Sequence, residues 1–262
     1  MSERRILCLL QIKEMKHIEE FCQKKLLYLR DVKTYSECEN DLTKAQIDES
    51  EGVLFEKQAD GPYVQILING KPTNMCRLSI SKGRYFASCY YAVYEDECIA
   101  QEVRPGVYKY TYHLDKNYLT SFYDSENKGI LVILSPNQFI EGIASVCEKD
   151  RLSCSPGKML YDKEQIINNT DCLAKLLQEG DKATLESLHH KPKRYSNEHE
   201  YRVVVEANSA KQEKNISLDL SDLNYSCIIY SLNKKPTEED DVAIEITQKL
   251  NDTNNRNDAK NT

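Results

Sequence analysis

Two glutamates and an arginine occupy alternate positions in the segment YSNEHEYR, residues 195–202. Alternate residues of a β-strand point to the same face, so a strand here would place Glu198, Glu200 and Arg202 together. Two carboxylates held side by side repel each other unless a cation or a ligand lies between them. Enzymes use such pairs for acid/base chemistry and electrostatic stabilisation. We therefore expect Arg202 to neutralise Glu200, and we regard all three residues as candidate catalytic groups.

The same pattern also has a purely structural interpretation. A charged outer face protects the edge strand of a sheet from pairing with other chains. His199 and Tyr201 would then point to the opposite face, and the carboxylates would lie in solvent. The spacing alone leaves both interpretations open.

The spacing of Glu198 and Glu200 resembles the E-x-E motif of arginine-specific ADP-ribosyltransferases, enzymes that use NAD. The resemblance implies that Glu200 stabilises the oxocarbenium-like transition state at the nicotinamide ribose. It also implies that Glu198 orients the acceptor and that Arg202 helps to set the orientation of Glu200. The expected function is therefore an NAD-using ADP-ribosyltransferase-like activity.

The resemblance also implies where NAD would bind. The family carries an arginine on an N-terminal strand, for which Arg30, after LLYL, is the candidate. It carries a serine-rich strand as well, for which Ser88 is a candidate and Ser79 with Ser81 an alternative. Tyr90, two residues after Ser88, would line the NAD cleft together with other tyrosines.

A broader resemblance covers most of the chain and points to the domain-of-unknown-function family numbered 2971, a group of bacterial and phage proteins. It rests on residues 21–52, 86–93, 129–143, 157–164 and 191–202. Many members occur near phage-defence genes, so the resemblance implies a role in conflict between bacteria and phages. The family often has a tryptophan before its late glutamate, whereas Tyr195 stands there in this chain.

Composition supports a second class of function, a non-enzymatic module that captures a protein or a nucleotide. The chain has a net charge of −7, 17 tyrosines and no tryptophan. The acidic balance argues against a broad nucleic-acid surface, while tyrosine suits protein recognition and base stacking. A third hypothesis, a metal-dependent nuclease that uses Asp48, Glu51 and the late glutamates Glu198 and Glu200, is disfavoured by the same acidic balance.

The cysteines and the apolar segments indicate a cytoplasmic protein without a membrane partner. The chain has 10 cysteines, none in a C-x-x-C pair, so we expect reduced thiols rather than a zinc site. No apolar run reaches the roughly 18 residues of a membrane helix. Cys89 lies in an apolar segment, which favours a structural thiol over a nucleophile.

Hydrophobic patterning predicts an α+β fold with a largely antiparallel or mixed sheet, flanking helices and a single domain over residues 1–235. Residues 236–262 are acidic and then polar, and we expect a disordered tail there. The expected strands are 26–29, 52–57, 62–69, 73–80, 86–96, 107–114, 129–135, 157–162, 199–207 and 225–232. The apolar residues 5–12 fit either a strand or the start of a helix. The expected helices are 13–24, one that begins at Pro136, and 171–188 with a break at Gly180.

Overall fold

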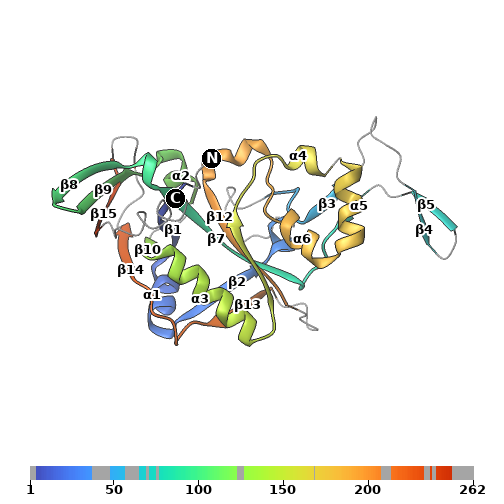
Figure 1. Ribbon diagram of the computed structural model, residues 1–262, viewed down its shortest axis with the longest axis horizontal. Coiled ribbons are helices and arrows are strands. Elements are labelled where there is room, and N and C mark those ends of the chain that lie inside the picture. Colours follow the sequence, from blue (N-terminus) through green and yellow to red (C-terminus); the bar gives the residue numbers. More distant parts are fainter. Residues whose placement is uncertain are drawn as a thin grey trace, which may run out of the picture.

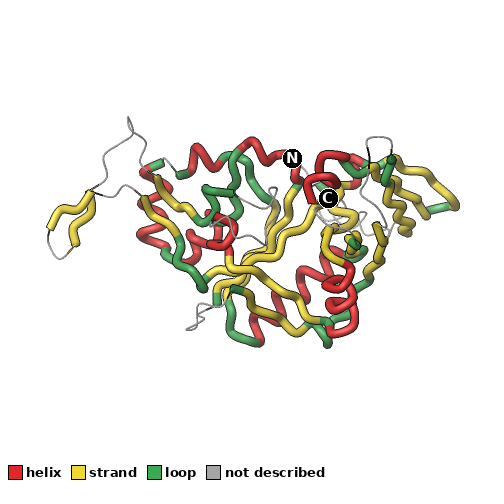
Figure 2. The backbone as a smooth tube through the Cα atoms, turned by 180° about the vertical axis from the view of Figure 1, so that it is seen from behind, coloured by secondary structure: helices red, strands yellow, loops and turns green. Residues whose placement is uncertain are grey.

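The centre of the molecule is an antiparallel sheet whose strands run through its middle, with helices around it (Figures 1 and 2). The computed structural model describes residues 4–36, 48–56, 65–68, 71–74, 77–122, 127–167, 169–207, 214–232, 237 and 240–249. The main path of the sheet has the order β11-β12-β7-β1-β10-β14, and β2 and β13 join it beside β7. Its strands are β1 (Ile6–Glu14), β2 (Leu26–Asp31), β7 (Tyr85–Tyr94), β10 (Lys128–Ile133), β11 (Ser153–Lys158), β12 (Glu200–Glu206), β13 (Asn215–Asp219) and β14 (Cys227–Leu232).

Smaller sheets and helices surround this centre. A three-stranded sheet contains β8 (Ile99–Arg104), β9 (Val107–His113) and β15 (Ala243–Lys249); two-stranded sheets pair β3 (Val53–Glu56) with β6 (Arg77–Ser79) and β4 (Gln65–Ile68) with β5 (Lys71–Asn74). The α-helices are α1 (Met15–Lys24), α2 (Lys116–Phe122), α3 (Pro136–Lys149), α4 (Lys163–Ile166), α5 (Thr170–Glu179) and α6 (Asp181–Ser187). Short 3-10 helices are η1 (Val32–Ser36), η2 (Glu95–Glu97) and η3 (Lys193–Glu198).

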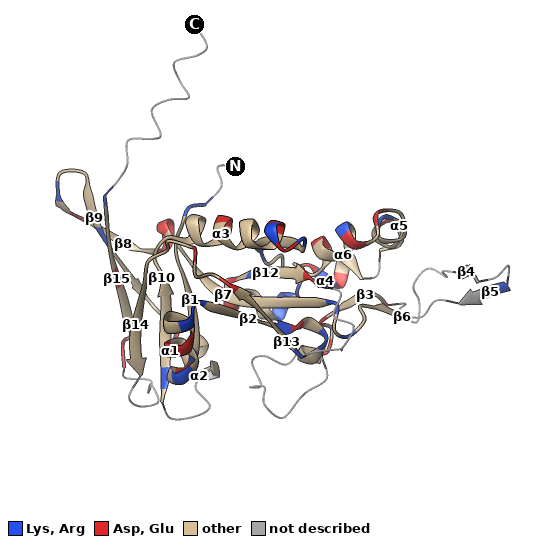
Figure 3. Cartoon of the chain, turned by 90° about the horizontal axis from the view of Figure 1, so that it is seen from below, with Lys and Arg blue, Asp and Glu red and all other residues tan. Residues whose placement is uncertain are grey.

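The central strands bury both faces, and successive side chains enter different cores. In β12, Val203 and Val205 pack into the core that α1 and α3 cover, whereas Val204 faces the core formed with α5, α6 and β3. A third core lies between the central sheet and the three-stranded sheet. Figures 1 and 3 place the three-stranded sheet and α4–α6 at opposite ends of the molecule.

The central sheet divides along one edge of β7. Near its C-terminal end β7 pairs with β1, where Leu10 lies opposite Tyr91; near its N-terminal end it pairs with β2, where Arg30 lies opposite Ala87. Residues 88–90 lie between the two stretches and pair with neither strand in the described part of the chain. β1 and β2 therefore separate here and leave a fork beside β7.

The side chain of Gln11 occupies part of this gap. Its Nε2 atom donates to the backbone oxygen of Cys89 at 2.7 Å and to Oγ of Ser88 at 3.0 Å. Buried backbone carbonyls require a hydrogen-bond partner, and the glutamine amide supplies the donor that a neighbouring strand would otherwise provide.

Helix α1 connects the two arms of the fork. Its buried side chains Ile18 and Phe21 face the core, while His17 and Glu20 remain accessible. The helix packs close to β10 because Gly129 lies beneath it: a Cβ atom at Gly129 would lie 2.3 Å from Sδ of Met15. The helix ends at Lys25, whose φ of 54° is left-handed and turns the chain into β2.

The structure confirms the predicted α+β fold with antiparallel sheets flanked by helices. It corrects the expected strand 157–162, because β11 spans Ser153–Lys158. Strands β8 and β13 and helix α2 were not expected. The prediction of a tail from residue 236 is also wrong in part: β15, Ala243–Lys249, pairs with β9, and its buried Ile244 and Ile246 alternate with polar residues.

The Asn69–Gly70 turn and residues 250–262 of the expected tail lie outside the described residues. Among the described helices, none has the length and apolar character needed to span a membrane.

We predict that the hydrogen bonds of Gln11 in the fork stabilise the folded protein. Gln11 is 6% exposed, and Gln11→Met removes the donor for Cys89 and Ser88 while preserving side-chain volume. We expect a loss of about 1–3 kcal/mol in the free energy of unfolding, measured in urea, because buried acceptors lose their partner. Gln101→Met on the exposed strand β8 is the control and should change stability by less than about 0.5 kcal/mol. Equal effects of the two substitutions would contradict the role assigned to Gln11.

Candidate functional site

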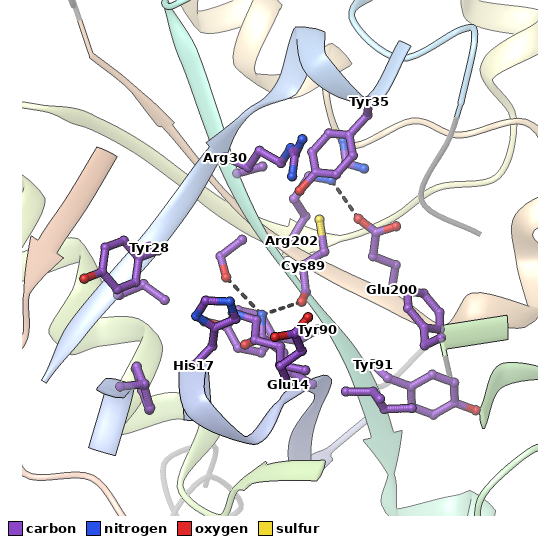
Figure 4. A pocket seen from close by; sticks show the side chains of 18 of the residues that line it. Glu14, His17, Tyr28, Arg30, Tyr35, Cys89, Tyr90, Tyr91, Glu200 and Arg202 are labelled. Atoms are coloured by element: carbon purple, nitrogen blue, oxygen red, sulfur yellow. Dashed lines mark hydrogen bonds and ion pairs between the residues drawn. The ribbon is translucent and has the colours of Figure 1, made fainter. Parts of the chain in front are cut away.

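A pocket of about 700 Å³ opens in the fork between β1 and β2. Its floor is β7, one wall is α1, and side chains of β12 enter from the far side of β7 (Figure 4). The six residues predicted from the sequence as catalytic or NAD-binding all line it: Arg30, Ser88, Tyr90, Glu198, Glu200 and Arg202. Residues that are distant in sequence thus share one cavity.

The two glutamates come together by a route that the sequence did not predict. They do not lie on one strand: Glu198 ends helix η3, His199 adopts a left-handed conformation with a φ of 44°, and β12 begins at Glu200. Both carboxylates nevertheless converge on one cation. Nζ of Lys191 lies 2.7 Å from Oε2 of Glu198 and 2.6 Å from Oε2 of Glu200. The lysine therefore supplies the charge that keeps the pair together.

Local contacts hold His199 in its left-handed conformation. Its ring stacks on Tyr91 with centroids 5.2 Å apart and an interplanar angle of 8°. Its Nδ1 atom lies 3.4 Å from Oε2 of Glu97, and its backbone oxygen accepts a hydrogen bond from Ala92 at 2.9 Å. A left-handed non-glycine residue is energetically unfavourable and persists where its surroundings fix it. This turn directs Glu198 and Glu200 toward Lys191.

Arg202 anchors Glu200, as the sequence predicted. Its Nε atom donates to Glu200 at 2.8 Å, and its two terminal nitrogens donate to the two oxygens of Glu51 at 2.8 and 3.0 Å. One terminal nitrogen also donates to the backbone oxygen of Leu188 at 2.9 Å. Arg202 is only 1% exposed, and these four hydrogen bonds hold its guanidinium group beside Glu200.

The ionic network continues beyond Glu51. Lys163 is buried, and its Nζ atom has no hydrogen-bond partner among the described residues. Burial lowers the pKa of Lys163, and the attraction of Glu51 and Asp48 opposes this effect only in part. Asp48 accepts hydrogen bonds from the backbone and the hydroxyl group of Ser50 through Oδ1. The charged cluster thus reaches from β12 to the turn before β3.

The two carboxylates of the pair have different proton affinities. Burial alone would raise the pKa of Glu200, but the attraction of Arg202 and Lys191 outweighs burial and holds that pKa well below its usual value. Glu198 has Lys191 as its ion-pair partner, and there burial dominates and raises the pKa to about 7. A fixed carboxylate beside one that titrates near neutral pH is the arrangement that acid/base chemistry requires.

The other predicted residues, Arg30, Ser88 and Tyr90, make contacts within the protein. Nε of Arg30 donates to Oγ1 of Thr34 at 2.9 Å, and the guanidinium group lies 5.9 Å from the ring centroid of Tyr35. Ser88 accepts a hydrogen bond from Gln11. Tyr90 is buried, and its ring lies edge-on to Phe139 with centroids 5.8 Å apart. Figure 4 shows Arg30, Tyr35 and Arg202 grouped at one end of the pocket.

Cys89 lies on the pocket floor beside Glu200. Burial raises the pKa of its thiol, and the neighbouring carboxylate of Glu200 raises it further. A thiol in this setting stays protonated and is a poor nucleophile. The structure therefore agrees with the structural interpretation of this cysteine.

The residues proposed for a metal-dependent nuclease do not form an open acidic site. Both oxygens of Glu51 accept hydrogen bonds from Arg202, and Asp48 bonds within its own turn. In the portion that the structure describes, no group of three or more His, Cys, Asp or Glu residues is arranged to hold a metal ion.

Sequence reasoning missed Lys13 and Gln11, which line the same pocket. The signal was present in the segment ILCLLQIKE, residues 6–14, where these two residues alternate with apolar ones. Polar residues at alternate positions of an otherwise buried strand indicate a partner or a cavity on that side.

No model of a protein family, no curated protein and no solved structure matches this chain. The function is therefore inferred from the residues and the geometry of the pocket.

We predict that loss of Arg202 from this ionic network strongly lowers the free energy of unfolding. Arg202→Met leaves the carboxylates of Glu51 and Glu200 buried without their main cation, so we expect a loss of about 3–5 kcal/mol in the free energy of unfolding. Arg84→Met is the control, because Arg84 pairs with Glu206 at 2.9 Å and with Asp181 at 2.7 Å but its side chain is 39% exposed, and it should lose less than about 1 kcal/mol. A cost for Arg202→Met as small as that of the control would contradict a tightly coupled network.

The raised pKa of Glu198 predicts a particular dependence of stability on pH. Between its ordinary value of 4.5 and about 7, the folded state binds more protons at Glu198 than the unfolded state does. The free energy of unfolding therefore falls as pH rises through this window. Relative to Glu198→Gln, the wild type should lose on the order of 2 kcal/mol between pH 5 and pH 8.

Urea unfolding at several pH values measures this difference. Glu148→Gln, on the exposed side of α3, is the control and should follow the wild-type curve. Parallel curves for the wild type and Glu198→Gln would show that Glu198 does not titrate in this range.

Proposed function

We propose that this chain is an NAD-using ADP-ribosyltransferase-like enzyme whose active site is the fork pocket. The observation that carries the proposal is the carboxylate pair: Glu200 is held ionised and Glu198 titrates near neutral pH, side by side in one cavity. Arg30 and Ser88, the residues suggested by the family resemblance, line the same cavity.

The pair has a defined role in such a reaction. The bond between the nicotinamide nitrogen and C1′ of the ribose breaks, and its electron pair leaves with nicotinamide. The positive charge that develops at C1′ is stabilised by the carboxylate of Glu200, which is fixed in place before the reaction. The acceptor forms a new bond to C1′ and releases a proton to Glu198, whose pKa of about 7 suits a general base.

The rest of the pocket suits a nucleotide. Tyrosine rings offer apolar faces on which a base stacks, and Tyr28 is 43% exposed at the pocket. Arg30 adds a planar cation beside Tyr35. We propose that this activity acts in conflict between bacteria and phages, as the resemblance to family 2971 proteins implies.

One observation favours a second candidate function, capture of a nucleotide without turnover. Both oxygens of Glu200 already accept charge-assisted contacts, one from Arg202 and one from Lys191. A carboxylate that two cations neutralise stabilises a developing positive charge less strongly than a free one. Such a pocket can hold its ligand and report its presence to a partner.

The proposal predicts that Glu200→Gln abolishes nicotinamide release from NAD. Loss of a preorganised charge at the reacting centre costs about 100- to 1000-fold in rate, so release should fall by at least about 100-fold. Nicotinamide is measured by chromatography. Glu206→Gln is the matched control, because Glu206 lies on the same strand and pairs with Arg84 at 2.9 Å, and it should retain the wild-type rate.

The stability of the variants decides between the two candidate functions. NAD should raise the melting temperature of the wild type and of Glu200→Gln, since binding stabilises the folded state by mass action. Stabilisation by NAD without nicotinamide release in the wild type would favour capture. Neither stabilisation nor release would overturn the use of NAD.

A further inference from the structure

Lys13 differs from the other cations of the pocket. Lys191 pairs with Glu198 and Glu200, and Arg202 pairs with Glu51 and Glu200. Arg30 bonds to Thr34. For Lys13, the structure describes neither an ion pair nor a hydrogen bond of its side chain within the ranges given above. A part-buried ammonium group therefore lines the pocket without a protein partner.

The position of Lys13 explains why it faces the cavity. It lies two residues after Gln11 on β1 and hence on the same face of the strand. Gln11 reaches back to β7, whereas Lys13 lies beyond the point at which β1 separates from β7 and pairs only with β10, where Gly129 lies opposite. Its side chain therefore enters the fork rather than a packed core.

An uncompensated cation in such a place is unfavourable for the ligand-free protein. Removing a charge from water costs free energy unless an opposite charge compensates. Burial correspondingly lowers the pKa of Lys13 to about 8. A group that costs stability and faces a cavity is a candidate for ligand binding.

We propose that Lys13 binds the phosphate groups of the pocket's ligand and thereby makes the pocket selective for a nucleoside diphosphate or its esters over a nucleoside. This inference deepens the proposed function, on which it rests for the nucleotide class of the ligand. The phosphate supplies the missing negative charge, and the tyrosine rings receive the base.

The acidic groups at the mouth of the pocket do not oppose an anion there. Glu14 pairs with Lys16 at 2.6 Å, and Glu20 pairs with Lys24 at 3.1 Å. Their negative charges are thus balanced by lysines outside the cavity. The carboxylates of Glu198 and Glu200 form ion pairs with Lys191 and Arg202 inside the cavity.

The pH dependence of anion binding is expected to follow Lys13, because burial lowers its pKa to about 8, inside the range between pH 7.5 and 9.5 in which binding is compared. The titratable groups that face the pocket from the surrounding elements are Glu14, His17, Glu20, Arg30, Tyr28, Tyr35, Glu51, Cys89, Tyr90, Tyr91, Tyr118, Lys128, Lys191, Glu198, Glu200 and Arg202. Burial raises the pKa values of Tyr35, Tyr91 and Tyr118 and of the Cys89 thiol. Glu198 titrates at about 7, below this range.

The test is calorimetric titration of the full chain with ADP, adenosine and inorganic pyrophosphate in metal-free buffer. Wild-type protein should bind ADP at least about tenfold more tightly than adenosine, since adenosine lacks the charge that Lys13 requires. Lys13→Met should remove most of this difference, and Lys13→Arg should retain it. Lys149→Met, an exposed lysine on α3, is the control for net charge and should bind as the wild type does.

Two further readouts separate binding from a structural role. Affinity for pyrophosphate should fall by up to tenfold per pH unit above pH 8 in the wild type, and this fall should vanish in Lys13→Arg, because a guanidinium group stays protonated. In the absence of ligand, Lys13→Met should melt at a higher temperature than the wild type, whereas loss of a structural lysine would lower the melting temperature.

Failure of this inference is distinguishable from failure of the proposed function. Lys13-dependent binding of ADP without consumption of NAD would retain the phosphate contact and reject the transferase. Nicotinamide release that is unaffected by Lys13→Met, with equal affinities for ADP and adenosine, would retain the transferase and overturn the role of Lys13. Absence of ADP and pyrophosphate binding at millimolar concentrations would also overturn it.

Discussion

The paired hydrogen bonds between Arg202 and Glu51 are the constraint on which the candidate site depends. They hold the guanidinium plane in one orientation, and the remaining Nε atom then faces Glu200. A buried ion pair contributes little net stability compared with apolar packing. Once formed, however, it holds its two side chains in a fixed orientation. We infer that the chain retains this network for the placement of Glu200, which an apolar core would not provide.

The charge balance of the network explains why the two glutamates of the pair behave differently. Around Arg202 the structure gathers three cations and four carboxylates: Lys163, Lys191 and Arg202 with Asp48, Glu51, Glu198 and Glu200. One negative charge is therefore in excess. Glu200 has two cationic partners and stays ionised, whereas burial and the neighbouring charge of Glu200 raise the pKa of Glu198 to about 7.

Much of the fold could be predicted from the sequence because its strands alternate strongly or are continuously apolar, as in residues 129–135. The pairing of Glu200 with Arg202 was also predictable, since the two residues lie two positions apart. The bond between Arg202 and Glu51 was not, because 151 residues separate them and no local pattern records the contact. Likewise, the convergence of Glu198 and Glu200 depends on Lys191 and on the turn at His199, and the strand spacing that suggested it does not exist in the structure.

The division of the sheet places opposite charges on different sides of the pocket. Lys13 stands on β1 and Glu200 on β12, with β7 between them. Tyr91 of β7 lies opposite both Glu200 and Leu10, and Lys13 lies three residues beyond Leu10, where β1 has separated from β7. The uncompensated cation lies on one side and the fixed carboxylate on the other. A ligand with phosphates at one end and a developing positive charge at the other matches this distribution in a single orientation. The fork in the sheet therefore determines which end of a nucleotide would meet Glu200.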